Sequence, residues 1–316
     1  MQSVREQIFS ISSLLLGMSM LLMGNSLQGT LIAIRAAGEQ FSDSSIGIMT
    51  SGYFLAFVLG ILVTTYLIER AGHIRGFTAL ASLASAAALG HIIIVDPIAW
   101  TVFRAISGFC FAGICIVIES WLNERATNET RGQVMAAYMF VNLMSLTAGQ
   151  FLVSAAYPLG YVLFCVVSIL VSIAIIPVSI TRTEAPTPQK PRPLPIRRLF
   201  SISPLGFIGC LGYGLALGAF WGLAPVFAGR VGLDVNGIAT VGIMRPEYLL
   251  YIAFVYGAAS FPLYALTVSH ANDYVEADER VVVSGTLLLT YGTGAIIGPV
   301  LAGPIMVELG VAGLFY

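Results

Sequence analysis

Two ionisable residues of this 316-residue chain stand inside apolar segments, where a charge is costly unless it has a partner or a role. Arg104 lies in the first turns of one such segment, and Glu119 follows the apolar run Ile116–Ile118. Arg104 is a candidate for binding an anionic group, and Glu119 for exchanging protons, because its apolar surroundings disfavour the charged form. The alternatives are an Arg104 side chain that extends to the surface, and a structural ion pair of Glu119 with Arg125 or Arg131.

Further polar and aromatic side chains inside the apolar segments are candidates for binding a solute or a coupling ion. A buried amide in lipid needs a hydrogen-bond partner, so each candidate is alternatively a contact between helices. Together they indicate a polar pathway through the protein. The additional candidates are Asn25, Gln28, Asn142, Gln150, Tyr213, Trp221, Tyr256 and Tyr291.

The sequence lacks the residue spacing that metal, phosphate-binding and catalytic sites require. His91 and His270 have no second His or Cys at ligand spacing, so we expect no metal site. The glycines between 206 and 218 are not followed by Lys-Ser or Lys-Thr, which favours helix packing over phosphate binding. There is no catalytic triad or carboxylate pair, and the basic residues form no stripe. We therefore expect no enzyme activity, no cofactor and no nucleic acid as partner.

The segments that position these side chains are predicted to be membrane-spanning helices. The chain is 57% hydrophobic and 10% charged, with a mean hydropathy of +0.89, whereas soluble domains are about a quarter charged. Its apolar runs are continuous over about 20 residues, which fits helices and not alternating barrel strands. The prediction is an all-α, polytopic membrane protein with nine full spans and two fragments. The spans begin near Ile8, Ser45, Gly76, Ile98, Gly132, Pro158, Pro204, Tyr248 and Val281, and the fragments near Gly237 and Val311.

The charges of the loops predict the orientation of these spans. If the N-terminus is cytoplasmic, eleven of the 15 basic residues lie in cytoplasmic loops and three in outer loops. The positive-inside rule therefore favours a cytoplasmic N-terminus in a bacterial-type inner (plasma) membrane. The segment 181–203, rich in Pro and Arg, is then a cytoplasmic linker. It separates a six-helix half at 1–180 from a second half at 204–316.

The two halves resemble each other in sequence. A shift of 149 residues superposes Arg131 on Arg280 and Gly149 on Gly298. The start of the second span, at Asp43, matches the segment from Asp234 only at a shift of 191. We interpret the pattern as an internal duplication in which the second half lacks 42 residues.

The missing residues are predicted to belong between Met244 and Arg245. The remaining fragment, from Gly237 to Met244, would rise only about 12 Å as a helix and could not cross the bilayer. We expect either no ordinary peptide bond between Met244 and Arg245 or a lateral opening there. The second half is thus predicted to lack about two helices and most of its last helix, which would begin near Val311.

Two helical halves joined by a cytoplasmic linker resemble the major facilitator superfamily. The segment 65–75 is similar to that family's loop motif between helices two and three, through Glu69, Arg70, Gly72 and Arg75. The resemblance implies a cytoplasmic gate in which Glu69 faces the start of a later helix, near Val281, where the helix dipole favours negative charge. The alternative is a solvated loop that follows the positive-inside rule.

Other motifs extend this resemblance over most of the chain. Residues 104–108 are similar to the family's helix-four motif, and 294–299 to its Gly-x-x-x-Gly-Pro motif. The segment 119–139 resembles the YcaD-type branch. The resemblance implies a secondary active transporter that moves a small solute by alternating access, with protons as a possible coupling ion, in monomeric form. The alternative is a non-transporting assembly factor or receptor derived from a transporter fold.

Overall fold

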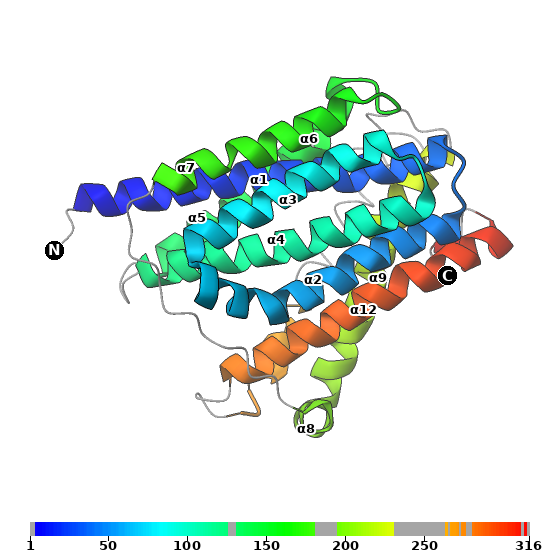
Figure 1. Cartoon of the computed structure of the whole chain (residues 1–316). Coiled ribbons are helices and arrows are strands. Elements are labelled where there is room, and N and C mark those ends of the chain that lie inside the picture. The colour runs from blue at the N-terminus through cyan, green and yellow to red at the C-terminus, as the bar shows by residue number, and fades with distance from the viewer. Residues whose placement is uncertain are drawn as a thin grey trace, which may run out of the picture. The chain divides into compact units, whose positions relative to one another are not determined.

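The computed structural model describes residues 4–125, 131–180, 195–230, 263–264, 266–271, 273–275, 280–310 and 313–314, and most of them are helical (Figure 1). The named helices are α1 (Val4–Gly38), α2 (Asp43–Ala71), α3 (His73–Ile93), α4 (Pro97–Arg125), α5 (Arg131–Leu152), α6 (Val162–Ile173), α7 (Ile175–Ile180), α8 (Ile196–Ile202), α9 (Pro204–Arg230) and α12 (Arg280–Leu309). A short 3-10 helix, Val153–Ala155, follows α5.

The predicted all-α membrane architecture is confirmed. Eight helices in the described part of the chain are long and apolar enough to cross a membrane. Each begins within four residues of a span start predicted from the sequence. The span predicted near Tyr248, the fragment near Gly237 and the junction of Met244 with Arg245 lie outside the described residues.

Local sequence explains where several helices begin and end. The Asp96 carboxylate accepts 2.9 Å hydrogen bonds from the backbone N–H groups of Ile98 and Ala99, which caps the start of α4. Gly72, with a φ of 81°, separates α2 from α3 in a backbone conformation that favours glycine. This glycine belongs to the predicted loop motif, so the motif lies at the turn where it was expected.

The chain forms two compact units. The first comprises Met1–Ile32 and Leu59–Gln189, and the second comprises Ala33–Val58 and Lys190–Tyr316. Helix α2 is divided between them: its first half belongs to the second unit and its second half to the first. The predicted halves, 1–180 and 204–316 with the linker 181–203, remain a prediction, and most of that linker lies outside the described residues.

In the first unit, α1 packs against α5 on one side and against α6 and α7 on another (Figure 1). The Ser26 hydroxyl donates a 2.7 Å hydrogen bond to the Leu146 carbonyl of α5. On the other side, Gly24 lies against Val171 and Leu170 of α6. Small residues on α1 therefore allow close approach on both sides.

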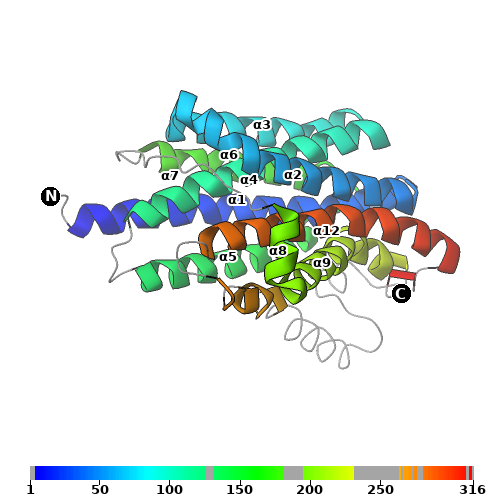
Figure 2. The same ribbon diagram turned by 90° about the horizontal axis from the view of Figure 1, so that it is seen from below.

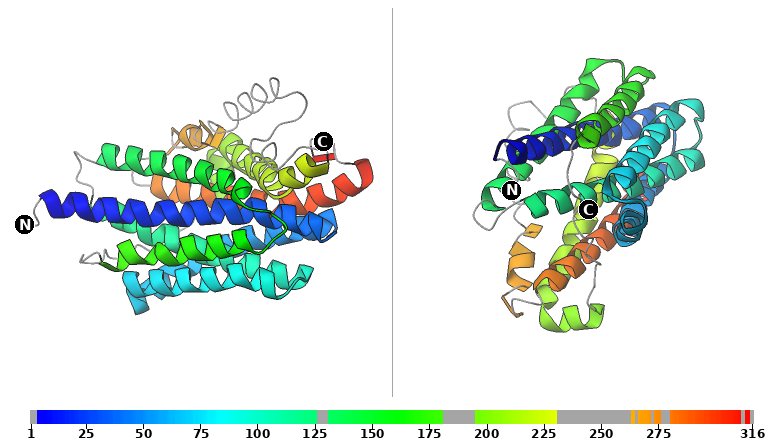
Figure 3. Two further views of the ribbon diagram at one scale, coloured as in Figure 1. Left: turned by 90° about the horizontal axis from the view of Figure 1, so that it is seen from above. Right: turned by 60° about the vertical axis from the view of Figure 1, so that its left-hand side comes forward.

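In the second unit, α9 and α12 cross each other at glycines on both helices (Figures 2 and 3). The position where a side chain of Gly214 would project is filled by the Tyr291 carbonyl. Likewise, the carbonyls of Leu211 and Leu215 fill the positions beside Gly294 and Gly298. Both helices thus carry a Gly-x-x-x-Gly spacing whose glycines lie in the shared interface.

The α1–α5 contact recurs in α9–α12 at two constant offsets. Three residue pairs of α1 and α5 match three pairs of α9 and α12 when 192 is added to the first residue and 149 to the second. The pairs Ser19–Ser145, Met23–Gly149 and Ser26–Leu146 correspond to Leu211–Gly294, Leu215–Gly298 and Gly218–Ala295. The predicted shift of 149 thus reappears in the contacts, while the earlier shift is one residue longer than the 191 read from sequence.

Candidate functional site

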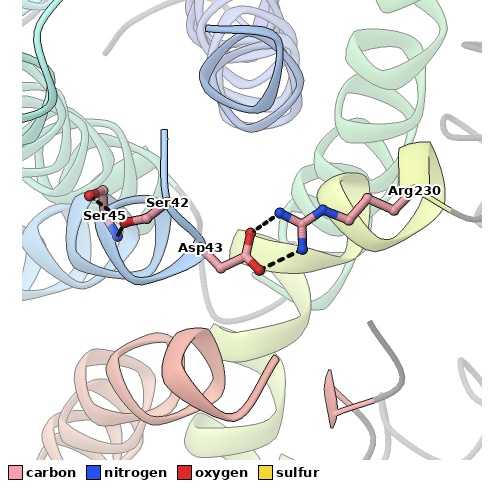
Figure 4. A network of polar contacts seen from close by, with 4 residues as sticks. All are labelled: Ser42, Asp43, Ser45 and Arg230. Atoms are coloured by element: carbon pink, nitrogen blue, oxygen red, sulfur yellow. Dashed lines mark hydrogen bonds and ion pairs between the residues drawn. The ribbon is translucent and has the colours of Figure 1, made fainter. Parts of the chain in front are cut away.

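An ion pair in the second unit joins α2 to α9 (Figure 4). Nη1 and Nη2 of Arg230 donate to Oδ2 and Oδ1 of Asp43, each at 2.6 Å. Two parallel bonds of this kind fix the relative orientation of the two side chains. The Asp43 side chain is 2% exposed and that of Arg230 is 42% exposed.

The local sequence explains why these two charges occupy these positions. Asp43 is the first residue of α2, and Arg230 is the last residue of α9. The Ser42 hydroxyl oxygen accepts a 3.1 Å hydrogen bond from the backbone N–H of Ser45, which caps α2 and fixes Asp43 in its first turn. The helix dipoles favour an anion at the start of α2 and a cation at the end of α9.

Close backbone contacts surround the ion pair. Gly303 of α12 lies against the Asp43 carbonyl and the Cα atom of Ser44, and Gly47 of α2 lies against the Pro299 carbonyl. Gly222 of α9 lies against the side chain of Thr50 in α2. The first half of α2 therefore contacts both α9 and α12 over more than two helical turns.

The second half of α2 has contacts of the same kind within the first unit. Gly60 lies against the Phe109 carbonyl and the Ala112 side chain of α4, and Gly113 of α4 lies against the Thr64 side chain. One helix is thus closely packed at its two ends against the helices of two different units.

Sequence reasoning did not single out Asp43 or Arg230. Asp43 was used only to mark the start of a span, and Arg230 only as one of three basic residues in outer loops. A signal was present, because an acidic first turn and a basic last turn of two neighbouring apolar helices are complementary. Only the tertiary structure shows that the two helix ends meet.

Two of the sequence candidates, Gln28 and Gln150, lie in polar contacts between helices, and a third, Arg104, is buried. Arg104 of α4 is buried, with 8% exposure, so its side chain does not extend to the protein surface. Gln28 donates a long, 3.4 Å hydrogen bond to Ser107. Gln150 accepts from Thr30 at 2.8 Å and its amide also donates to Ser26 at 2.9 Å, which favours the alternative role of a contact between helices.

Glu119 and Asn142 meet at Tyr138. The Tyr138 hydroxyl donates a 2.5 Å hydrogen bond to the Glu119 carboxylate, and Tyr138 also shares a side-chain hydrogen bond with Asn142. The cluster joins α4 to α5. A short bond from a neutral hydroxyl to a carboxylate orients the carboxylate and stabilises its charged form.

Two of the aromatic candidates, Tyr213 and Tyr291, lie together with Tyr264. The ring centroids of Tyr213 and Tyr291 are 5.6 Å apart, and Tyr264 is 6.2 Å from the first and 5.7 Å from the second. These distances are typical of packed aromatic pairs. Of the other candidates, Trp221 is exposed and Asn25 is half-buried in α1. Tyr256 lies outside the described residues.

The predicted gate motif lies at the end of α2 and the start of α3. Glu69, Arg70 and Arg75 have exposed side chains on either side of the Gly72 turn. The contact of Glu69 with the start of a later helix near Val281 stays a prediction. Among the residues that the structure describes, no three His, Cys, Asp or Glu side chains are grouped so that they could hold a metal ion.

Comparison with known proteins places these features in a family context. A model of the Major Facilitator Superfamily matches residues 14–245. The chain is 26% identical to an uncharacterized MFS-type transporter, YcaD, of Escherichia fergusonii, with 90% of this chain and 86% of the relative covered. It is 27% identical to YcaD of Salmonella newport, with 93% and 88% covered.

Solved structures of transporters share the fold at low sequence identity. The nucleoside transporter NupG matches with a TM-score of 0.79 at 12% identity, over 94% of this chain and 91% of NupG. A bacterial homolog of the human lysosomal transporter Spinster, inward-facing and occupied, matches with a TM-score of 0.75 at 15% identity, over 98% and 85%. At this identity the likeness concerns the fold alone.

The alignment to the Salmonella relative is longer than the part of this chain that it contains. It extends over 336 residues, whereas 93% of 316 residues is about 294. About 42 aligned positions of the relative thus have no counterpart in this chain. The surplus has the length of the gap predicted between Met244 and Arg245, whose position stays a prediction.

Proposed function

Because the chain belongs to the major facilitator superfamily, a family of transporters and not of enzymes, we propose that it moves a small solute across the inner membrane by alternating access. It is a multi-pass membrane protein. In the proposed cycle it acts as a monomer, without nucleic acid. The solute binds between the two helical halves, and each end of the pathway opens in turn.

The packing of α2 is the observation that carries this proposal. Its first half is held by α9 and α12 through the Asp43–Arg230 ion pair and glycine contacts, and its second half is held by α4. A gate needs contacts that close one end of the pathway and can separate as a group. Where a glycine lies against the backbone of the facing helix, no interlocking side chains have to change rotamer, so the two helices can separate easily.

We assign the Asp43–Arg230 contact to the outer end of the protein. The assignment follows from the proposed cytoplasmic N-terminus, because α1 then leads outward to the start of α2. The motif with Glu69, Arg70, Gly72 and Arg75 lies at the opposite end of α2 and is proposed to form the cytoplasmic gate. The two gates then belong to the two ends of one helix.

The proposed solute is small and neutral, amphipathic or singly anionic. Arg104 is proposed to attract an anionic group, since it is the one buried cation inside a span of the described residues. Tyr213 and Tyr291 are proposed to contact an apolar or planar part of the solute. Since NupG is a nucleoside transporter, nucleosides belong in the first screening panel.

Proton coupling is proposed to use Glu119. Its carboxylate is oriented by Tyr138, and a carboxylate at the edge of an apolar span can change its protonation as its surroundings change. Asn142 supports Tyr138 from the same helix. The polar contacts of Asn25, Gln28 and Gln150 are proposed to hold α1, α4 and α5 in position.

A disulfide across the outer contact tests the proposal. Thr50→Cys and Gly222→Cys place two thiols in the contact of α2 with α9, where the side-chain position of Gly222 meets the Thr50 side chain, 3.0 Å from its Cβ atom. In proteoliposomes screened with metabolites, drugs and nucleosides, oxidation of this pair should stop uptake of a transported solute. Reduction should restore it, while each single cysteine should be insensitive to oxidant.

Two outcomes would contradict the proposal. Uptake that continues at the full rate with the disulfide formed would show that α2 does not move away from α9. Absence of uptake or binding for the whole panel, with a correctly folded protein, would favour a non-transporting assembly factor or receptor.

A further inference from the structure

An apolar groove of about 350 Å³ lies where α8, α9 and α12 meet within the second unit. Its lining comes from the start of α8, the first half of α9 and the first half of α12. Among the described residues that line it, none is charged. The lining residues include Ile196, Phe207, Leu211, Thr286, Thr290 and Thr293.

Three threonines make the α12 side of this groove apolar in spite of their hydroxyl groups. The hydroxyls of Thr286, Thr290 and Thr293 each donate to a backbone carbonyl one turn earlier, at 2.8, 2.9 and 2.9 Å. Since a hydroxyl has one hydrogen to donate, none of the three offers a donor to a ligand. The groove therefore favours an alkyl chain over a polar solute.

This side of α9 and α12 faces lipid. Ile208 of α9 is 58% exposed, and Thr293 in the groove is exposed as well. The first unit is open at the matching face, because Leu16 corresponds to Ile208 by the offset of 192 and Met144 to Thr293 by the offset of 149, and both are exposed. In that unit α6 packs on another side of α1. An exposed apolar surface of this kind on membrane-spanning helices is typical of contact with lipid.

Helix α8 places positive charge beside the groove. Leu199 is buried in the core that α8 shares with α9 and α12. Ile196 and Phe200 lie four residues apart on one face of α8, and both are exposed. Arg197 and Arg198, between them in sequence, are exposed too. Exposed apolar residues next to basic ones are typical of a helix that lies in the membrane interface.

We propose that the groove holds one acyl chain of an anionic phospholipid whose phosphate group binds Arg197 and Arg198. Guanidinium groups bind phosphate oxygens through charge-assisted hydrogen bonds, often two at a time. Under the proposed orientation α8 lies at the cytoplasmic leaflet, whose negative surface attracts basic residues. The lipid contacts α8, α9 and α12 at once, so it stabilises the second unit whether or not a solute is bound.

Photo-cross-linking with two lipids tests this binding. The full chain is reconstituted in phosphatidylcholine nanodiscs that contain a small, equal fraction of either phosphatidylglycerol or phosphatidylcholine with a diazirine in the acyl chain. Mass spectrometry then identifies the labelled peptides. We expect label at Phe207–Leu211 and Thr286–Thr293, at least about fivefold more from phosphatidylglycerol. No solute takes part, so the result is independent of the proposed transport.

Three variants separate the headgroup contact from the acyl-chain contact. Arg197→Gln with Arg198→Gln should reduce the phosphatidylglycerol label in the groove to the phosphatidylcholine level. Arg70→Gln with Arg75→Gln removes the same charge from the turn between α2 and α3 and should leave this label unchanged. Thr290→Phe should fill the groove and reduce the label from both lipids, while the melting temperature stays within a few degrees of that of the parent.

Equal labelling of the groove by the two lipids would overturn the proposal. So would an undiminished preference for phosphatidylglycerol after Arg197→Gln with Arg198→Gln, or a label that Thr290→Phe leaves unchanged. Label confined to other parts of the chain would leave the groove to a second copy or to another protein, and would overturn it as well.

Discussion

At the scale of single residues, the charges that matter lie at helix ends and inside spans. Asp43 begins α2 and Arg230 ends α9, so each charge is stabilised by its own helix dipole as well as by its partner. Asp43 is almost fully buried, and a buried carboxylate without a partner is costly. The buried Asp43 carboxylate is therefore stabilised only while Arg230 at the end of α9 lies beside it.

The first prediction concerns this ion pair. Arg230→Ala leaves the buried Asp43 carboxylate without its partner, so it should weaken the contact of α2 with α9 by at least about 1 kcal/mol, the upper value for a pair exposed to solvent. Measured as the initial rate of disulfide formation between Thr50→Cys and Gly222→Cys, the effect should be at least about a fivefold decrease. The exchanged pair Asp43→Arg with Arg230→Asp should recover part of the rate. An unchanged rate in Arg230→Ala would show that the glycine contacts alone hold α2.

The second prediction concerns Glu119 and Tyr138. Glu119→Gln should abolish acidification of the lumen when a transported solute enters proteoliposomes that contain a pH-sensitive dye, because the amide cannot release a proton. Tyr138→Phe removes the hydrogen bonds to Glu119 and Asn142 but keeps the carboxylate, so it should alter the pH dependence of uptake while keeping proton movement. Thr147→Ser on the exposed face of α5 is the control and should behave as the parent. Proton movement retained in Glu119→Gln would place the coupling elsewhere.

At the scale of helices, glycine decides how closely α9 and α12 approach. Gly214, Gly218, Gly294 and Gly298 all face backbone atoms of the partner helix, so any side chain there needs the two helices to separate. Without a hydrophobic driving force between helices in lipid, such close van der Waals packing is a main source of helix association.

The third prediction tests this packing with a matched control on one helix. Gly214→Ala or Gly298→Ala should lower the melting temperature by several degrees, since each methyl group would overlap a carbonyl of the facing helix. Gly212→Ala on α9 has open space around its position and should be neutral or stabilising by up to about 1 kcal/mol through helix propensity. Thermal unfolding in one detergent measures all three. Equal melting temperatures for Gly214→Ala and Gly212→Ala would contradict the close contact.

At the scale of the whole molecule, the recurring contacts relate the helix pair α1 and α5 to the helix pair α9 and α12. Their two offsets, 192 and 149, differ by 43 residues, while the aligned relative has about 42 positions without a counterpart. This agreement supports a connection between α9 and α12 that is about 42 residues shorter than the one between α1 and α5. Where in the connection these residues are missing stays a prediction.

The fourth prediction follows from that difference. Inserting the unmatched segment of Salmonella newport YcaD, about 42 residues, between Met244 and Arg245 should raise the melting temperature by several degrees, because about two added helices bury exposed apolar surface. A Gly/Ser linker of equal length is the control and should lower it or leave it unchanged. The same result for both insertions would show that the segment belongs elsewhere. Comparing uptake of the parent and the chimera would also show whether transport depends on the segment.

The sequence by itself determined the helical membrane class, eight of the span positions, the loop glycine at Gly72 and the shift of 149 residues. These follow from local composition and spacing. A helix that crosses the bilayer needs about 20 apolar residues, and the two related interfaces have glycines at matching positions. Only the tertiary structure decided that Asp43 meets Arg230, that Tyr138 joins Glu119, and that Gln150 is engaged by α1. The physical reason is that a side chain's partner depends on which helix faces cross, and helices of similar apolar composition do not specify that order locally.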